Sequence, residues 1–223
     1  ITSTVKSNGD FAVISYTGNG TASATLGHSL SAAPDFVIVK NRSTDSTNWN
    51  IWGNGTNFTR FGQFGTQSER TDTQYHPTMG STTITLPSTN DGAWNTSSDN
   101  YIMYVWRNVT GKQQFGKYTG NASSTGPTVS LGFRPGLVMI KALDRDNSVW
   151  YVFDTSRQPF NDPTNYTHKY LKWNSTDAEY TNADDGKIEI TSTGFQIRAG
   201  VSGMNASGEE YIYAAWAGSY SDF

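Results

Sequence analysis

Short apolar runs separated by polar turns follow one another along the whole chain. Phe11 to Thr17 alternates apolar and polar positions and is rich in β-branched and aromatic residues, which predicts a half-buried strand. Residues 35–40 and 137–141 are continuous apolar runs that are too short for helices. Pro34 and Pro135 lie just before them, where a central strand can start without losing a ladder hydrogen bond. Residues 101–106 and 211–216 are again strand-like. The pattern predicts an all-β chain of antiparallel sandwiches.

The sequence repeats itself once, because five blocks recur in the same order. The pairs are residues 15–20 with 117–122, 26–28 with 131–133, 33–40 with 134–141, 49–52 with 150–153 and 95–102 with 205–212. Each copy closes on a tryptophan, at Trp106 and Trp216. We therefore predict two similar antiparallel β-sandwich units in tandem, residues 1–112 and 113–223, joined by a short polar stretch. A single fused sandwich with internal pseudo-symmetry is the alternative.

The middles of the two copies differ most in sequence. Residues 54–94 and 154–204 vary between the copies, and the second stretch is longer. Contact functions commonly sit on loops that a rigid scaffold positions, so we expect function there. No amphipathic helix is evident, although a short helical turn near residues 177–180 is predicted.

Composition narrows the classes of protein. The 223 residues carry 16 Lys+Arg and 19 Asp+Glu, so there is no basic footprint for nucleic acid or an anionic membrane. Cysteine is absent, which excludes disulfides and thiolate chemistry and fits a protein that folds in a reducing cytoplasm and works outside it. No apolar run approaches a membrane helix. The first residue, Ile1, is not Met, so we expect a fragment or a processed product.

A catalytic constellation is not evident, and we predict no enzymatic activity and no cofactor. His28 occupies the place of Phe133 in the other copy, which favours packing over catalysis. His76 lies in a polar loop and His168 in a possible surface strand. The nucleophile elbow, the H-E-x-x-H pattern and the Walker loop are all absent.

The carboxylates give no stronger signal. Glu209 and Glu210 align with Asp99 and Asn100, so one copy lacks the second carboxylate. The stretch Asp144–Asn147 invites a calcium interpretation, but the EF-hand pattern breaks at once, and a plain polar turn is favoured. We predict no metal site.

Aromatic residues are the remaining candidates for binding. The four tryptophans that recur, Trp49, Trp106, Trp150 and Trp216, are predicted to lie in the core. Five aromatic residues of the variable middles are not shared between the copies and could stack on sugars or fill an interface. These predicted ligand-binding residues are Trp94, Tyr75, Trp173, Tyr166 and Tyr180. Partial burial under a loop is the competing explanation for each.

Several phrases together resemble a domain found in virion proteins of marine bacteriophages, often those of cyanobacteria. They are Tyr-Thr-Gly-Asn-Gly, Pro-Asp-Phe-Val-Ile-Val-Lys, Trp-x-Val-Phe-Asp at residues 150–154, and Asn-Ala-Ser-Gly-x-x-Tyr-Ile-Tyr-x-x-Trp at residues 205–216. The resemblance covers almost the whole chain, once per copy. It implies a lectin-like or jelly-roll-like sandwich on the virion surface, and it carries over no catalytic or binding residue.

The leading hypothesis is a bacteriophage virion surface protein, either a tail-fibre or spike segment or a capsid decoration protein. Its partners would be other virion proteins and host surface glycans, with no nucleic acid and no membrane. By analogy with phage fibres, which are commonly trimers, we expect a homo-oligomer. The alternatives are a carbohydrate-binding module of a secreted bacterial protein and a glycan hydrolase, for which two carboxyl groups would have to face each other across a cleft.

Overall fold

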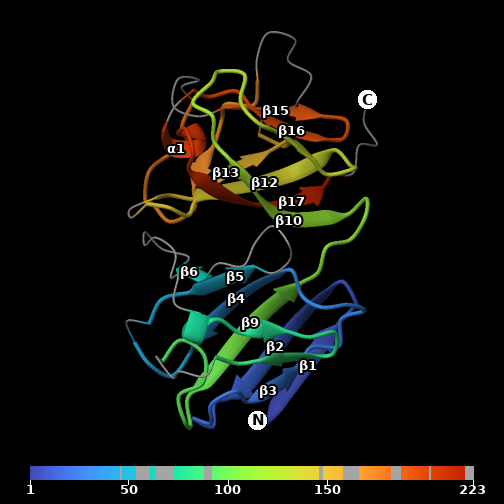
Figure 1. Ribbon diagram of the computed structural model, residues 1–223, viewed down its shortest axis with the longest axis vertical. Helices are drawn as coiled ribbons and strands as arrows, with labels where there is room; N and C mark the ends of the chain where they lie inside the picture. Colours follow the sequence, from blue (N-terminus) through green and yellow to red (C-terminus); the bar gives the residue numbers. More distant parts are fainter. Residues whose placement is uncertain are drawn as a thin grey trace. The chain divides into compact units, whose positions relative to one another are not determined.

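The chain forms two compact units, Ile1–Asn108 and Val109–Phe223, in a computed structural model (Figure 1). The structure describes residues 1–45, 47–53, 61–63, 73–87, 92–145, 148–157, 166–181, 187–200 and 202–218. The predicted all-β fold is confirmed. Within these ranges the only helical segments are η1 (Thr73–Tyr75) and α1 (Ser202–Asn205), and neither could span a bilayer. The helical turn predicted at residues 177–180 is wrong, because Tyr180 pairs there as a β-bridge.

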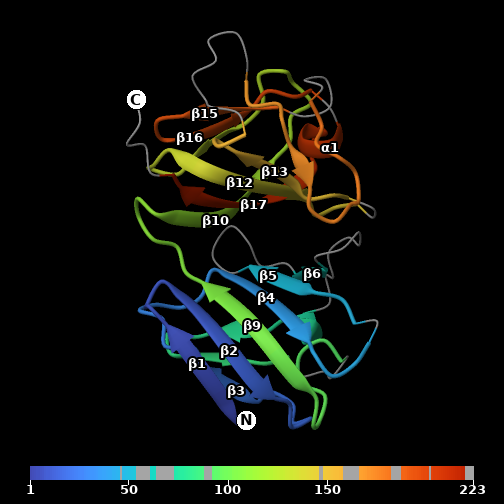
Figure 2. The same ribbon diagram turned by 180° about the vertical axis from the view of Figure 1, so that it is seen from behind.

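Unit 1 consists of two antiparallel sheets. The larger has the strand order β1 (Ser3–Ser7), β2 (Phe11–Thr17), β9 (Asn100–Trp106), β4 (Phe36–Asn41), β5 (Asn50–Gly53) and β6 (Phe61–Gln63). The smaller has the order β3 (Thr25–Gly27), β8 (Thr83–Thr85) and β7 (Thr78–Met79). Figure 2 shows β1, β2, β9 and β4 side by side.

Unit 2 has a corresponding strand order. Its larger sheet runs β10 (Gln113–Thr119), β17 (Glu210–Ala217), β12 (Pro135–Ala142), β13 (Tyr151–Asp154) and β14 (Leu171–Lys172). Its smaller sheet runs β11 (Thr128–Ser130), β16 (Gly194–Ile197) and β15 (Ile188–Thr191). The repeated sequence blocks therefore occupy like places: β2 and β10, β4 and β12, β5 and β13, and β9 and β17.

The period-2 pattern of each strand places one face of the larger sheet against the smaller sheet. In unit 1, Ile14, Val37 and Val105 are fully buried in one cluster with Leu26 of β3 and Ile84 of β8. Val138, Ala215 and Phe153 do the same in unit 2, against Val129 of β11 and Phe195 of β16. Burial of these faces supplies the main driving force for each sandwich.

A buried asparagine, which we call the asparagine clasp, closes one end of each sandwich. In unit 1 the amide of Asn95 donates to Asn19 Oδ1 (3.1 Å) and to the Thr21 carbonyl (2.8 Å), and its Oδ1 accepts from the Asn19 amide (2.9 Å). In unit 2, Asn205 makes the same bonds to Asn121 and to the Ser123 carbonyl. Both asparagines are buried, and each satisfies turn groups that no strand reaches.

A stacked tyrosine pair lies beside each clasp. The rings of Tyr16 and Tyr101 are 4.9 Å apart at an interplanar angle of 9°, and those of Tyr118 and Tyr211 are 5.1 Å apart at 11°. Tyr16 donates to the Trp94 carbonyl and Tyr118 to the Met204 carbonyl, each over 2.7 Å. Burial raises the pKa of both donating hydroxyls, so they stay protonated as donors.

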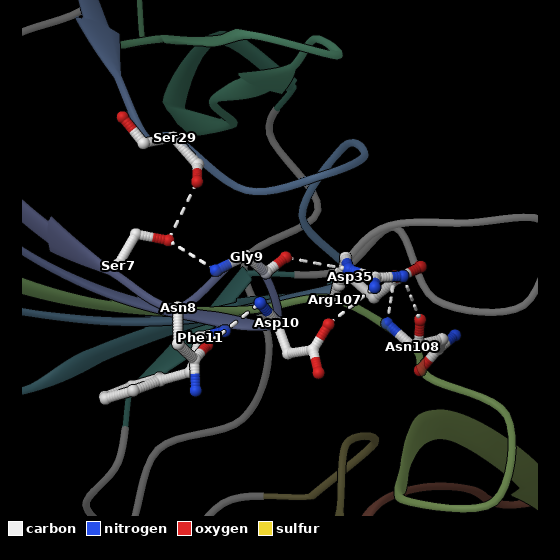
Figure 3. A network of polar contacts seen from close by, with 9 residues as sticks. All are labelled: Ser7, Asn8, Gly9, Asp10, Phe11, Ser29, Asp35, Arg107 and Asn108. Atoms are coloured by element: carbon white, nitrogen blue, oxygen red, sulfur yellow. Dashed lines mark hydrogen bonds and ion pairs between the residues drawn. The ribbon is translucent and has the colours of Figure 1, made fainter.

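One network of side-chain contacts at the end of unit 1 has no counterpart among the described residues of unit 2 (Figure 3). Arg107 donates to the Gly9 carbonyl (2.9 Å) and to Asp10 Oδ1 (2.5 Å), while the Asn108 amide donates to Asp35 Oδ2 (2.6 Å). Burial raises the pKa of Asp35, although the Asn108 amide and Arg107 oppose this effect. In unit 2 the aligned sequence has glycine and alanine in place of Asp35 and Arg107.

The packing prediction for His28 is confirmed. Its ring is fully buried, as is most of Phe133 at the equivalent place. His28 Nδ1 accepts from the Leu30 amide (3.1 Å) and Nε2 lies 3.2 Å from the Gly80 carbonyl, so the neutral ring with hydrogen on Nε2 satisfies both bonds. Burial lowers the pKa of His28, partly opposed by the bond to Gly80.

This burial makes unit 1 sensitive to mild acid. The unfolded chain, with a histidine pKa of about 6.5, takes up the proton before the folded chain does, so stability falls as the pH drops below about 6.5 until the folded-state pKa is reached. We expect His28→Phe, which copies unit 2, to remove this loss. Thermal unfolding at about pH 7.5 and about pH 5 measures it. Equal pH dependence in both proteins would contradict the assignment.

Close backbone approach beside the clasp generates a second prediction. A Cβ atom on Gly18 would lie 2.2 Å from the Thr96 carbonyl oxygen, and one on Gly120 would lie 2.2 Å from that of Ala206. Gly18→Ala should therefore lower the free energy of unfolding by about 1–3 kcal/mol in denaturant titrations. The matched control is Gly27→Ala, whose Cβ meets nothing within 4 Å. A Gly18→Ala variant as stable as this control would disprove the clash.

Candidate functional site

The structure separates the five aromatic residues that the sequence singled out. Trp173, Tyr166 and Tyr180 lie in one stretch of unit 2, with Trp173 56% and Tyr166 39% exposed. Tyr75 lies in η1 of unit 1 and is half-buried. Trp94 is only 1% exposed and belongs to the core of unit 1, so its ring cannot meet a ligand there. The candidate surface is therefore on unit 2.

Trp173 sits in a tight turn directly after the edge strand β14. The Ser175 amide donates to the Lys172 carbonyl (3.1 Å), which closes the turn around Trp173. The Trp173 amide donates to the Trp150 carbonyl (3.0 Å). Asn174 Oδ1 accepts from the Trp150 amide (2.9 Å). The amide and the carbonyl of Trp150, a fully buried residue, therefore both hold the turn in place. The exposed indole is thus carried by an anchored backbone.

Tyr180 is held next to this turn by ring stacking and a chain of polar contacts. Its ring stacks on buried Tyr170 at 5.0 Å and 5°, and the backbones of the two residues pair. Lys172 Nζ donates to the Tyr180 hydroxyl (2.8 Å) and lies 4.0 Å from the ring centroid. The hydroxyl in turn donates to Asp177 Oδ2 (2.8 Å). This chain orders the segment from Lys172 to Tyr180.

The two charged residues of this chain titrate accordingly. Burial lowers the pKa of Lys172, but the bond to Tyr180 and the nearby negative groups outweigh it and raise the pKa overall. Hydrogen bonds from Tyr180 and Ser175 lower the pKa of Asp177. Both groups are therefore charged at neutral pH. A shallow depression of about 320 Å³ lies along residues 177–180 and presents these polar groups to solvent.

Tyr166 is positioned by different contacts. Thr167 pairs with Ile188 of β15, which places Tyr166 beside the smaller sheet of unit 2. The guanidinium carbon of Arg198 lies 4.9 Å from the Tyr166 ring centroid, and Lys187 Nζ lies 5.8 Å from it. Two cations thus already lie close to this ring, and Tyr166 is less exposed than Trp173.

Two exposed apolar side chains were missed by the sequence analysis. Leu171, at 39% exposure, lies on β14 two residues before Trp173. We call Leu171, Trp173 and Tyr180 the aromatic edge. Trp49, predicted to lie in the core, is 40% exposed, and that prediction is wrong. It follows a polar turn before β5, and its ring lies 6.2 Å from that of Tyr104.

The other chemical candidates have structural roles where they are described. His168 Nδ1 donates to the Tyr166 carbonyl (3.0 Å), and Asp144 Oδ2 accepts from the Glu210 amide (2.6 Å). Glu209 pairs with Arg145 and accepts from Tyr211. Asp146 and Asn147, from the stretch considered for calcium, lie outside the described residues. The described part of the chain contains no cluster of three or more His, Cys, Asp or Glu side chains suited to a metal.

Comparison with known proteins gives one match. A family model described as a domain of unknown function (DUF7483) matches residues 1–219 and so spans both units. No curated protein and no solved structure matches the chain significantly.

The anchored turn at Trp173 generates a third prediction. Asn174→Ala removes the acceptor for the Trp150 amide, so this amide should exchange hydrogen faster while the core of unit 2 stays protected. Hydrogen exchange read out by mass spectrometry measures the difference. Ser175→Ala, which removes the hydroxyl that accepts from the Asp177 amide, is the control and should leave Trp150 unchanged. Unchanged exchange at Trp150 in Asn174→Ala would show that Asn174 does not anchor the turn.

Proposed function

The chain belongs to the DUF7483 family, and we propose that it is a non-enzymatic surface protein of a bacteriophage virion, either a tail-fibre or spike segment or a capsid decoration protein. In this role it contacts other virion subunits and binds host surface glycans through the aromatic edge of unit 2. The observation that carries the proposal is the exposure of Trp173, which is 56% exposed. Its turn is held by hydrogen bonds to the backbone amide and the backbone carbonyl of Trp150.

The geometry of the aromatic edge favours glycan contact. An indole that is more than half exposed can bury the apolar face of a sugar ring, and an anchored turn lowers the ordering cost of binding. Lys172, Asp177 and the Tyr180 hydroxyl add hydrogen-bonding groups along the same segment. Apolar surface with a few placed polar groups is the general composition of a small-ligand site.

The virion location is supported by the sequence rather than by the site. The repeated phrases resemble a domain of marine phage virion proteins, and the absence of cysteine fits folding in a cytoplasm before release. The proposed role is passive, and an architecture in which sheets carry loops of different sequence supports it. The expected homo-oligomer belongs to this proposal by analogy with phage fibres.

A carbohydrate-binding module of a secreted bacterial protein is the second candidate, because the aromatic edge would serve it equally well. The two candidates differ in where the protein is found. An antibody raised against the chain, applied to purified particles and to culture supernatant of the source, separates them. Labelling of intact particles supports the virion proposal, and labelling of free protein alone supports the secreted module.

The fourth prediction tests the aromatic edge directly. On an array of bacterial envelope oligosaccharides, the full chain should bind a subset of glycans, and Trp173→Ala should weaken that binding by at least about tenfold, or ~1.4 kcal/mol. The matched control is Trp49→Ala, which removes an exposed tryptophan of unit 1 and should bind as the unaltered chain does. Equal binding by the Trp173→Ala variant, or no glycan bound by the unaltered chain, would reject the proposed site.

A further inference from the structure

A polar groove crosses four strands on the outer face of the larger sheet of unit 1, on the side away from the smaller sheet. Register places Thr4 opposite Ser15 and Thr17 opposite Asn100, while the Arg42 amide donates to the Asn100 carbonyl (2.7 Å). These side chains thus form rows across β1, β2, β9 and the end of β4, which lie side by side in Figure 2. The groove has a volume of about 160 Å³ and is also bordered by Thr2 and Ser3.

The groove presents hydrogen-bonding groups that the fold itself does not use. Within the described part of the chain, neither the Arg42 guanidinium nor the hydroxyls of Thr4 and Ser15 have a hydrogen-bond or ion-pair partner. Thr17 donates to Asn100 Oδ1 (3.0 Å) and so holds that amide in place. Arg42 and Thr4 are exposed. A free guanidinium beside free hydroxyls is a surface prepared for an anionic, hydroxyl-rich ligand.

Charge on this face is of one sign. The outward positions of β1, β2, β9 and β4, taken from the register, include Lys6 and Lys40 and continue to Arg42, and none of these described positions holds a carboxylate. The nearest carboxylate in sequence, Asp99, is engaged by Asn41 and Thr44. The groove therefore carries uncompensated positive charge in a chain whose net charge is negative.

Unit 2 provides an internal comparison, because its equivalent face is neutralised. Lys117 replaces Ser15 and pairs with Glu210, which replaces Asn100 (Nζ to Oε1, 2.5 Å). Leu143 replaces Arg42, and its amide bonds to the Glu210 carbonyl as that of Arg42 does to Asn100. β10 forms the edge of its sheet, so the described part of unit 2 has no counterpart of β1. As far as the two units are described, only unit 1 has this groove.

We propose that this groove binds one acidic sugar residue of a polysaccharide, with Arg42 holding its carboxylate or sulfate and Thr4, Ser15 and Asn100 its hydroxyls. The volume suits a single residue, since pockets for drug-sized ligands begin at about 300 Å³. Single-stranded nucleic acid, the other anionic polymer, is disfavoured because bases need exposed aromatic platforms, and the aromatic residue that lines the groove, Tyr16, turns its ring into the core and is 4% exposed. The inference goes beyond the proposed function, because it concerns a different unit and no residue of the aromatic edge.

The test uses the full chain and three polysaccharides in affinity electrophoresis. Polygalacturonate carries carboxylates, dextran sulfate carries sulfates, and dextran carries neither. We expect retardation by at least one of the two charged polymers and none by dextran. The charged polymer that retards the chain identifies the anion that is bound. Retardation by both charged polymers means that the negative charge itself is recognised. Retardation by neither charged polymer would overturn the proposal.

Two variants assign the binding to the groove. Arg42→Gln removes the cation, and Asn100→Glu introduces the carboxylate of unit 2 beside it; each should weaken binding about tenfold or more. Lys112→Gln is the charge-matched control and should bind as the unaltered chain does. Binding kept in both groove variants, or an Arg42-dependent preference for single-stranded DNA over both polymers, would overturn the proposal. Trp173→Ala should leave this binding intact, so failure here and failure of the aromatic edge are separate results.

Discussion

The buried asparagine of each clasp is the contact on which the arrangement of loops depends. Each sandwich must turn its chain back at an end where the sheets no longer supply backbone partners, and an unpaired buried polar group there would cost about 1–3 kcal/mol. Asn95 and Asn205 supply those partners from one side chain. The strength of the constraint is visible at Ala122, which keeps a left-handed backbone (φ 55°) where unit 1 has Gly20 (φ 67°). The same end is thus formed by two different sequences.

With the ends and the core fixed in this way, the two units differ mainly in what they present to solvent. Unit 2 carries an anchored tryptophan directly after β14, which takes the place that β6 has in the larger sheet of unit 1. Unit 1 extends its sheet at the opposite edge by β1, which has no counterpart among the described strands of unit 2, and so gains the groove with Arg42, Thr4 and Ser15. The groove therefore arises where one copy has a strand that the other lacks, whereas the aromatic edge arises from a different sequence at an equivalent strand.

The strands could be predicted because apolar and polar residues alternate along them. The equivalent places of the repeated blocks in the two units could be predicted because the same residues recur in the same order. His28 was assigned to the core for the same reason, since the other copy has Phe133. Trp94 and Trp49 show where recurrence misleads. Trp94 is unique to its copy yet buried, and Trp49 recurs yet is exposed, because burial depends on which neighbours cover a position. Arg42 could not be found from sequence, since only the register brings it beside Ser15 and Thr4.

The position of the last strand in each unit has a mechanical consequence. β9 lies between β2 and β4, and β17 lies between β10 and β12, so each unit ends on an inner strand of its larger sheet. Tension applied to the polypeptide at Asn108 would first stretch the hydrogen bonds of Arg107 to Gly9 and Asp10. It would then shear the hydrogen bonds of β9 to β2 and to β4 at the same time. Many hydrogen bonds must then fail at once rather than one after another. A chain built this way resists drag along its length better than one whose units end on a peripheral strand.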